Sequence, residues 1–348
     1  MPTLPAPIHL DNGVEVNVIP MPSTELVTIS IMFFGGQWVQ EKKLQSNLAL
    51  QQIKSGTESF TAEFLSDKLD YYGATITTDA TINYGFLRLN GLRRTLPDVL
   101  PLFREIIISP TYEQPLFDNA IEESYLSYQV SEQKVAYVSK RVFYQQLLGF
   151  HHPAAQYVDE QAYQSIRRED LLAYHQRFIT LSNAVIYVTG NVDDALLALV
   201  NSQLGSIPCG EPHPHAYQRA DIVSPSQMMH ETTLNVPSVQ SGLRLGKVLP
   251  DASSADFPAI HLSSVIIGGY FGSRLMKNIR ERLGFTYGIG STFYPIPYNN
   301  ILIIATETPR EHVVRCIEEI KKDIADMQQH PVSNEELDNA LNSTKTLQ

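Results

Sequence analysis

The chain has 348 residues, of which 43% are hydrophobic and 18% charged, the composition of an ordinary globular protein long enough for two domains. Its net charge is -11 and no basic run exceeds two residues, which excludes an extended nucleic-acid-binding surface. No apolar run reaches the ~18 residues that cross a bilayer, and two distant cysteines do not form a disulfide framework.

The first half predicts strands where apolar residues alternate and helices where they recur every three or four positions. In chain order it reads strands 13–19 and 26–34, helices 44–53 and 61–72, strands 74–79 and 84–92, helices 95–108, 117–148 and 169–179, strand 184–188 and helix 193–204. A stretch rich in Pro, His, Ser and Asp follows, and this composition is typical of a linker.

The second half predicts the same kinds of element in a shorter series. In chain order it reads strand 240–247, helices 257–267 and 273–283, strands 285–292 and 300–307, and helices 311–328 and from 334 onward. We therefore expect an N-terminal α/β domain over 1–210, a linker region over 211–236 and a C-terminal α/β domain over 237–348.

The two halves resemble divergent copies of one unit. Gly73 and Gly284 each end a predicted helix and precede a predicted strand, and Phe117-Asp-Asn-Ala120 corresponds to Leu337-Asp-Asn-Ala340. The first half continues through several further elements after this point, whereas the second stops at Gln348. We therefore expect the second domain to be incomplete in this sequence, either as a fragment or because another molecule completes it.

One segment combines a helix, a turn and a strand with two reactive side chains. It begins with Ser273-Arg274-Leu275, carries Arg280 near the end of the predicted helix, and places Tyr287 in the strand after Gly284. Arg280 and Tyr287 could converge near one end of a sheet. The structural alternative is a helix C-cap with an exposed Arg and a strand Tyr packed on a neighbour.

This segment resembles the second-half signature of the pitrilysin/insulinase family of zinc metallopeptidases, in the branch close to mitochondrial processing peptidase. Active members carry His-x-x-Glu-His on a helix, which supplies two zinc ligands and the Glu that activates water. Anchored on Gly56-Thr57, these positions fall on Asn47, Leu50 and Gln51. Neutral amides are poor zinc ligands and Leu50 transfers no proton, so the motif is lost.

The family's third zinc ligand is a Glu on a downstream helix. Counted back from His152-Pro153, its position falls on Tyr128, which cannot replace a carboxylate. A slipped alignment could bring a carboxylate of the same predicted helix to this position, from Glu122, Glu123 or Glu132. It could not restore the other two ligands, so the resemblance implies a chain that holds no metal.

The resemblance implies an α+β fold of two repeated α/β halves, each with a mainly antiparallel sheet packed by helices in the clam-shell arrangement of these peptidases. It implies a non-catalytic subunit that forms a heterodimer with a zinc-bearing paralogue, or a homodimer when alone. Arg280 and Tyr287 would then act on an extended peptide in the partner's site. The alternative is a structural or peptide-binding relative with no role in catalysis.

Two further expectations concern metal and compartment. His213-Pro-His215 has the composition of a solvated loop rather than a metal pair, and a relocated metal site would need a cluster that the sequence does not contain. The N-terminus lacks the charged and apolar regions of a signal peptide. We therefore expect a cytoplasmic protein, with a periplasmic one as the alternative if the N-terminus is processed.

Overall fold

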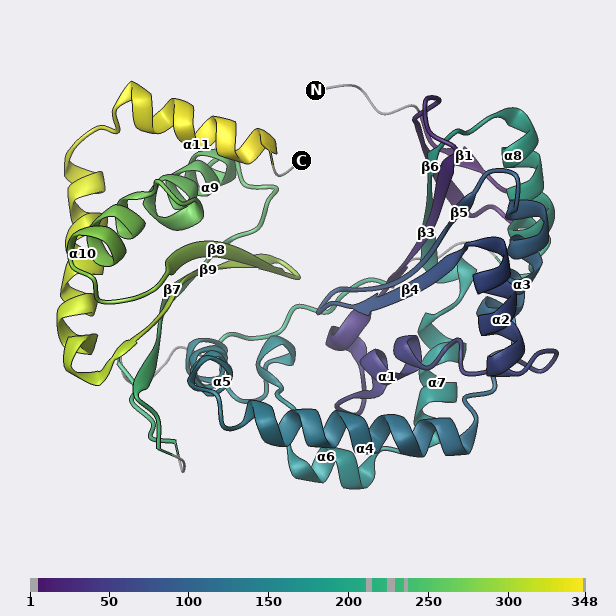
Figure 1. Ribbon diagram of the computed structural model, residues 1–348, viewed down its shortest axis with the longest axis horizontal. Helices are drawn as coiled ribbons and strands as arrows, with labels where there is room; N and C mark the ends of the chain where they lie inside the picture. The colour runs from purple at the N-terminus through teal and green to yellow at the C-terminus, as the bar shows by residue number, and fades with distance from the viewer. Residues whose placement is uncertain (1–5, 211–214, 224–228, 235–236, 347–348) are drawn as a thin grey trace. The chain divides into compact units, whose positions relative to one another are not determined.

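The computed structural model describes residues 6–210, 215–223, 229–234 and 237–346. His213 and parts of the predicted linker lie outside these ranges. The chain packs as two compact units. Unit 1 comprises Met1–Tyr125 and Tyr157–Gln218, and unit 2 comprises Leu126–Gln156 and Arg219–Gln348. Each unit is built on its own sheet (Figure 1).

Unit 1 contains a six-stranded sheet in the order β1-β2-β6-β3-β5-β4. Every neighbouring pair is antiparallel except β2 and β6, which are parallel. The strands are β1 (Ile8–His9), β2 (Glu15–Pro20), β3 (Leu26–Phe34), β4 (Thr75–Ala80), β5 (Tyr84–Leu92) and β6 (Ala184–Gly190). Alternate residues of β3 and β6 are buried, as the period of a strand with one core face requires.

Helices cover the core face of this sheet, and α2, α3 and α8 run along it in Figure 1. The helical elements of unit 1 are η1 (Gly36–Val39), α1 (Gln45–Gln51), α2 (Ala62–Tyr72), α3 (Leu96–Ile108), the first part of α4 (Gln114–Ser131), α6 (Glu160–Ser165), α7 (Arg168–Phe178), η3 (Leu181–Asn183), α8 (Asp194–Val200) and the π-helix η4 (Asn201–Gly205). Thr61 caps α2 by accepting from the Phe64 N–H, as its sequence position predicts.

Unit 2 contains a three-stranded antiparallel sheet in the order β7-β9-β8. The strands are β7 (Gln240–Pro250), β8 (Ile289–Ile296) and β9 (Asn299–Pro309). The helical elements are the end of α4, α5 (Val135–Leu148), η2 (Pro153–Ala155), α9 (Phe257–Ser264), the π-helices η5 (Val265–Gly269) and η6 (Met276–Arg282), η7 (Arg310–His312), α10 (Val313–Gln329) and α11 (Asn334–Thr346).

The two faces of this smaller sheet have different coverings. Leu243 and Leu245 point to the core that η6 and α10 complete with Ile279 and Ile320. The opposite face of β7 packs on α5, where a Cβ on Gly246 would lie 2.6 Å from the Phe143 ring. Because α5 packs on β7, residues 126–156 group with unit 2.

The predicted mixed fold with mainly antiparallel sheets is confirmed. Several expected elements differ, and two of the differences change where a helix or strand begins or ends. The single helix over 117–148 is wrong, because α4 ends at Ser131 and α5 begins at Val135, which lets α5 turn onto β7. The strand expected from residue 285 begins at Ile289, and residues 285–288 form a loop.

The repeat predicted from the sequence has a counterpart in backbone conformation. Gly73 and Gly284 follow α2 and η6 with φ of 62° and 65°, a left-handed conformation that favours glycine at a helix C-terminus. An antiparallel hairpin follows each of them, β4–β5 in unit 1 and β8–β9 in unit 2. The two segments therefore share one local plan.

Candidate functional site

Helix α1 carries the positions where the family resemblance predicts a lost zinc motif. Asn47 and Gln51 are four residues apart, so they share one face of the helix, and both are exposed. Leu50, at the position where the resemblance predicts the water-activating Glu, is only 1% exposed. The side chain at this position therefore packs in the core of this chain.

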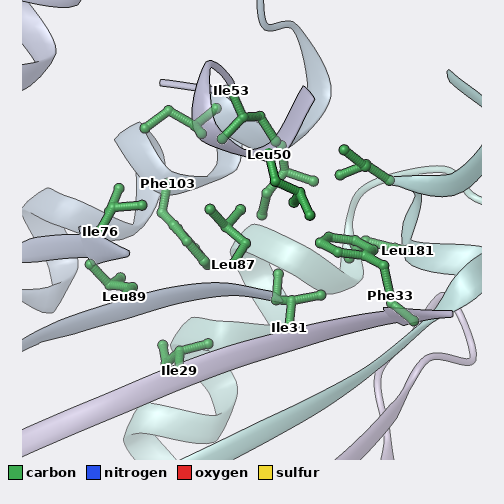
Figure 2. Close-up of a cluster of buried hydrophobic side chains, with 14 of the residues drawn as sticks. Ile29, Ile31, Phe33, Leu50, Ile53, Ile76, Leu87, Leu89, Phe103 and Leu181 are labelled. Atoms are coloured by element: carbon green, nitrogen blue, oxygen red, sulfur yellow. The ribbon is translucent and has the colours of Figure 1, made fainter. Parts of the chain in front are cut away.

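Leu50 is part of the apolar core between α1 and the sheet. Figure 2 shows it beside Ile53 and pointing into the cluster that contains Phe33, Leu87 and Leu181. A Cβ on Gly85 of β5 would lie 2.7 Å from Leu50 Cδ1, so the leucine fills the space above that glycine. A carboxylate here would be buried among hydrocarbon groups with no partner, which is costly.

The exposed face of α1 makes amide hydrogen bonds instead of metal bonds. Gln37 Nε2 donates to Asn47 Oδ1 at 2.9 Å and to the Ala80 carbonyl at 3.3 Å, which connects α1 to the end of strand β4. Among the residues described, no group of three or more His, Cys, Asp or Glu side chains could hold a metal ion. The residues present at α1 therefore do not fit zinc.

Tyr128, the predicted position of the third ligand, lies half-buried on α4 in the part of that helix that belongs to unit 2. The alternative carboxylates Glu122 and Glu123 are exposed on the same helix, whereas Glu132 lies just after its end and accepts a hydrogen bond from Arg141 at 2.6 Å. The alignment that places Tyr128 at the ligand position stays a prediction.

The segment that carries Arg280 is a π-helix, η6, in place of the regular helix expected at 273–283. The Leu283 N–H donates to the Asn278 carbonyl at 3.0 Å, a spacing of five residues that widens the last turn. Such widened turns occur often at functional sites because they change the direction of a side chain. Here the widened turn contains Arg280.

Two other arginines of this segment are used by the fold. Arg274 donates to Glu336 at 2.8 and 3.1 Å and to Asp326 at 3.0 Å, and this pairing lowers the pKa of Glu336 to about 2. Arg282 donates to Asn278 and to Glu319. These contacts hold η6 against α10 and α11, so both arginines have a structural role.

Arg280 differs from these two neighbours. Its guanidinium makes no hydrogen bond or ion pair with any residue in the described part of the chain. It lies over the ring of Phe271, with Cζ 4.6 Å from the ring centroid. All five of its N–H donors therefore lack an acceptor among the residues that the structure describes, although the side chain is only partly exposed.

Tyr287 lies in the loop before β8 rather than in the strand expected from the sequence. Its side chain is 91% exposed, and its hydroxyl has no hydrogen-bond partner among the residues described. Three threonines hold this loop: Thr286 donates to the Glu307 carbonyl at 2.7 Å, Thr308 to the Phe285 carbonyl at 2.7 Å, and Thr306 to the Gly288 carbonyl at 2.8 Å. Hydrogen bonds from threonine hydroxyl groups thus hold this loop in place of the backbone hydrogen bonds that a paired strand would make.

A shallow depression of about 370 Å³ lies beside this loop within unit 2. Its lining residues come from β7, β9 and the loop: Gln240, Arg244, Thr286, Tyr287, Gly288, Ala305, Thr306 and Glu307. Arg244 donates to the Thr306 carbonyl and to Ala136 of α5, so it fixes the wall of this depression. Tyr287 therefore borders this depression, whose lining includes several polar side chains.

The structure places Arg280 and Tyr287 in the same unit, and no hydrogen bond or cation–π contact joins their side chains in the described ranges. Sequence reasoning missed Phe271 and Thr306, which hold the two segments. Phe271 had a weak signal, an aromatic residue between two glycines just before Ser273, whereas the role of Thr306 depends on strand register and had none. No helix in the described ranges is both long and apolar enough to cross a membrane.

Comparison with known proteins identifies the family. Residues 165–344, just over half of the chain, match the family described as Peptidase M16 inactive domain. The chain belongs to this family. The assignment confirms the predicted resemblance to the pitrilysin-type peptidases and agrees with the non-catalytic role implied by the lost zinc motif.

Similar proteins carry related names. The chain is 20% identical over 90% of its length to a Helicobacter pylori protein named "Non-peptidase homolog YmxG", of which it covers 72%, and 20% identical over 96% of its length to the Bacillus subtilis "Uncharacterized zinc protease YmxG", of which it covers 81%. A crystal structure of a peptidase M16 inactive domain from Pseudomonas fluorescens matches with a TM-score of 0.85 at 20% identity, covering 98% of this chain and 83% of that one. This last match confirms the fold.

Proposed function

We propose that this M16-family chain is the non-catalytic subunit of a two-chain zinc peptidase, to which it supplies Arg280 and Tyr287. One observation carries the proposal: the polar groups of these two side chains are not used by the fold, whereas Arg274 and Arg282 beside them are. Polar groups that a protein keeps without internal partners are available to bind a ligand. The partner would be a paralogue that carries an intact zinc motif.

The chemistry of the two groups suits a peptide substrate. A guanidinium and a phenolic hydroxyl both donate hydrogen bonds to carbonyl oxygens, and a guanidinium binds developing negative charge more strongly because it is itself charged. In the complex they would hold the substrate main chain or stabilise the oxyanion that forms on its carbonyl. Neither group can activate water alone, so the chain by itself would be inert.

The substrate would bind as an extended segment. Strand β4 ends the sheet of unit 1, and Gln37 and Asn47 place side-chain amides beside its last residue, Ala80. An extended peptide can add to such an edge through main-chain hydrogen bonds, which read sequence weakly. This surface also favours the second candidate function, a peptide-binding or structural relative, because it needs neither Arg280 nor Tyr287.

A reconstitution experiment tests the proposal. The chain and a zinc-bearing family member encoded in the same genome are purified and assayed alone and mixed, with a mixture of quenched fluorescent peptides as substrate. We expect activity only in the mixture, and we expect Arg280→Ala or Tyr287→Phe to lower its turnover by roughly 10- to 1000-fold, the range for loss of one oxyanion donor. Lys277→Ala, on the same helix as Arg280, and Tyr71→Phe are matched controls, since both residues are exposed, and should leave turnover unchanged.

Each other outcome has a defined meaning. Equal turnover for the wild-type chain and both test variants would contradict a role of this chain in catalysis and would favour the peptide-binding function. Binding of labelled peptide to the chain alone then measures that second function. Chelator-sensitive cleavage by the chain alone would contradict both functions, because it would require a metal site that the described residues do not form.

A further inference from the structure

In the described part of the chain, the guanidinium of Arg280 interacts with an aromatic side chain. Its guanidinium carbon lies 4.6 Å from the centroid of the Phe271 ring, within the distance at which a cation is attracted to the face of an aromatic side chain. Phe271 is 64% exposed, so the pair stands at the surface of unit 2 rather than in its core. A large apolar side chain left this exposed adds little to core packing.

The local backbone brings this ring to the helix. Phe271 lies in the turn between η5 and the helix that continues into η6, and the Ser273 N–H closes that turn by donating to the Tyr270 carbonyl at 3.1 Å. A Cβ on Gly272 would lie 2.9 Å from the Tyr270 ring, so a larger residue there would have to displace that ring. Phe271 lies nine positions before Arg280 in the sequence. The turn reverses the chain direction and places the Phe271 ring against the Arg280 side chain.

The contact has a consequence for how Arg280 can bind. An arginine side chain has several rotatable bonds, and fixing them when a ligand binds costs conformational entropy. A guanidinium held over a ring has already lost part of that freedom, while the ring accepts none of its conventional N–H···O hydrogen bonds. A fork of this kind matches paired oxygen acceptors, such as carbonyl and carboxylate groups of a peptide.

We propose that Phe271 is a positioning residue that holds the Arg280 guanidinium in the orientation in which it binds peptide oxygen atoms. This inference rests on the proposed function, in which Arg280 contacts the substrate. It adds that the activity of Arg280 depends on an aromatic ring at position 271. An apolar residue of similar size that has no ring does not replace it.

The test is a double-mutant cycle in the reconstituted complex, assayed with the same mixture of quenched peptides. Phe271→Leu keeps an apolar side chain but removes the ring, and we expect it to lower kcat/KM about two- to fivefold, the worth of an exposed cation–π contact. Phe271→Tyr keeps the ring and should retain wild-type activity. In the Arg280→Ala background, Phe271→Leu should cause no further loss, because the residue acts through Arg280.

Phe64→Leu is the matched control, because Phe64 is also exposed and also has a cation over its ring, Lys68 at 5.5 Å, but lies in unit 1. It should leave kcat/KM unchanged. A second readout does not depend on activity: the Nε–H NMR signal of Arg280, assigned by its loss in Arg280→Lys, should carry a ring-current shift that Phe271→Leu abolishes and Phe271→Tyr preserves.

The outcomes separate the two proposals. If Arg280→Ala lowers turnover but Phe271→Leu does not, the inference is wrong and the proposed function stands. If Phe271→Leu reduces activity equally in both backgrounds, Phe271 acts independently of Arg280 and the inference is again wrong. If Arg280→Ala has no effect, the proposed function fails. An Arg280 Nε–H signal that does not change in Phe271→Leu would overturn the inference whatever the activities.

Discussion

Helix α1 and the segment from η6 to the Tyr287 loop are the two regions where the family resemblance predicts function, and the fold uses their side chains differently. In α1, Leu50, at the position where the resemblance predicts the family's catalytic Glu, is buried against Gly85. Beside it, Asn47 is bonded to Gln37. In the second region, Arg280 and Tyr287 keep their polar groups without partners in the described structure.

The difference separates two kinds of change in an enzyme family. A lost catalytic position can be taken over by the core, and then folding itself selects the new apolar residue. A position whose polar groups the fold does not use can be changed with little effect on folding. Stability measurements should therefore separate the two regions before any substrate is known.

The largest effect is expected when the family's Glu is put back into α1. Leu50→Glu should lower the free energy of unfolding by about 4 kcal/mol or more, because it buries a carboxylate in an apolar cluster. Asn47→His, on the exposed face of the same helix, should change it by about 0.5 kcal/mol or less. Urea unfolding followed by circular dichroism measures both, and a Leu50→Glu protein as stable as wild type would contradict the buried position.

The next effect distinguishes two arginines of the second region. Arg274→Ala should destabilise unit 2 by roughly 1.5–3 kcal/mol, because it removes charged hydrogen bonds to Glu336 and Asp326. Arg280→Ala should stay within about 0.5 kcal/mol of wild type, since no such bond is lost. Hydrogen exchange of amides in η6 and α11 reports the difference. Equal destabilisation by both variants would make Arg280 a structural residue.

A smaller effect tests the packing between α1 and β5. Gly85→Ala should cost about 1 kcal/mol, because the new Cβ would lie 2.7 Å from the flexible end of Leu50 and push it aside. In a Leu50→Ala background the same substitution should be neutral or stabilising, because it enters the space left by the leucine. Thermal unfolding of the four proteins of this cycle gives the coupling, and simple additivity would mean that the two residues do not touch.

The smallest effect concerns pH. The Arg274 guanidinium lowers the pKa of Glu336 to about 2, from an ordinary value of 4.5, so the folded state favours the ionised carboxylate. The resulting stabilisation is complete above about pH 4.5 and is lost as the pH falls through about 2. Because the pair is partly exposed, its worth is roughly 0.5–1 kcal/mol. Glu336→Gln should flatten the stability–pH curve in this window, and an unchanged curve would contradict the pairing.

The sequence by itself determined several features through local rules. Gly73 and Gly284 mark the helix ends because only glycine adopts a left-handed backbone without strain. The hairpin β4–β5 and helix α10 follow from apolar periods of two and 3.6 residues. The family followed from a pattern of side chains at fixed spacing. The assignment of Asn47, Leu50 and Gln51 to the lost zinc motif stays a prediction.

Only the tertiary structure decided the rest, because it depends on residues far apart in the chain. Leu50 is buried because β5 offers the space above Gly85, 35 positions away in sequence. Tyr287 lies in a loop because threonine hydroxyls of β9 take the place of a strand partner. Residues 126–156 join unit 2 because α5 finds its apolar contact on β7. Local periodicity cannot report contacts of this kind, because each one is formed by partners that the chain brings together only when it folds.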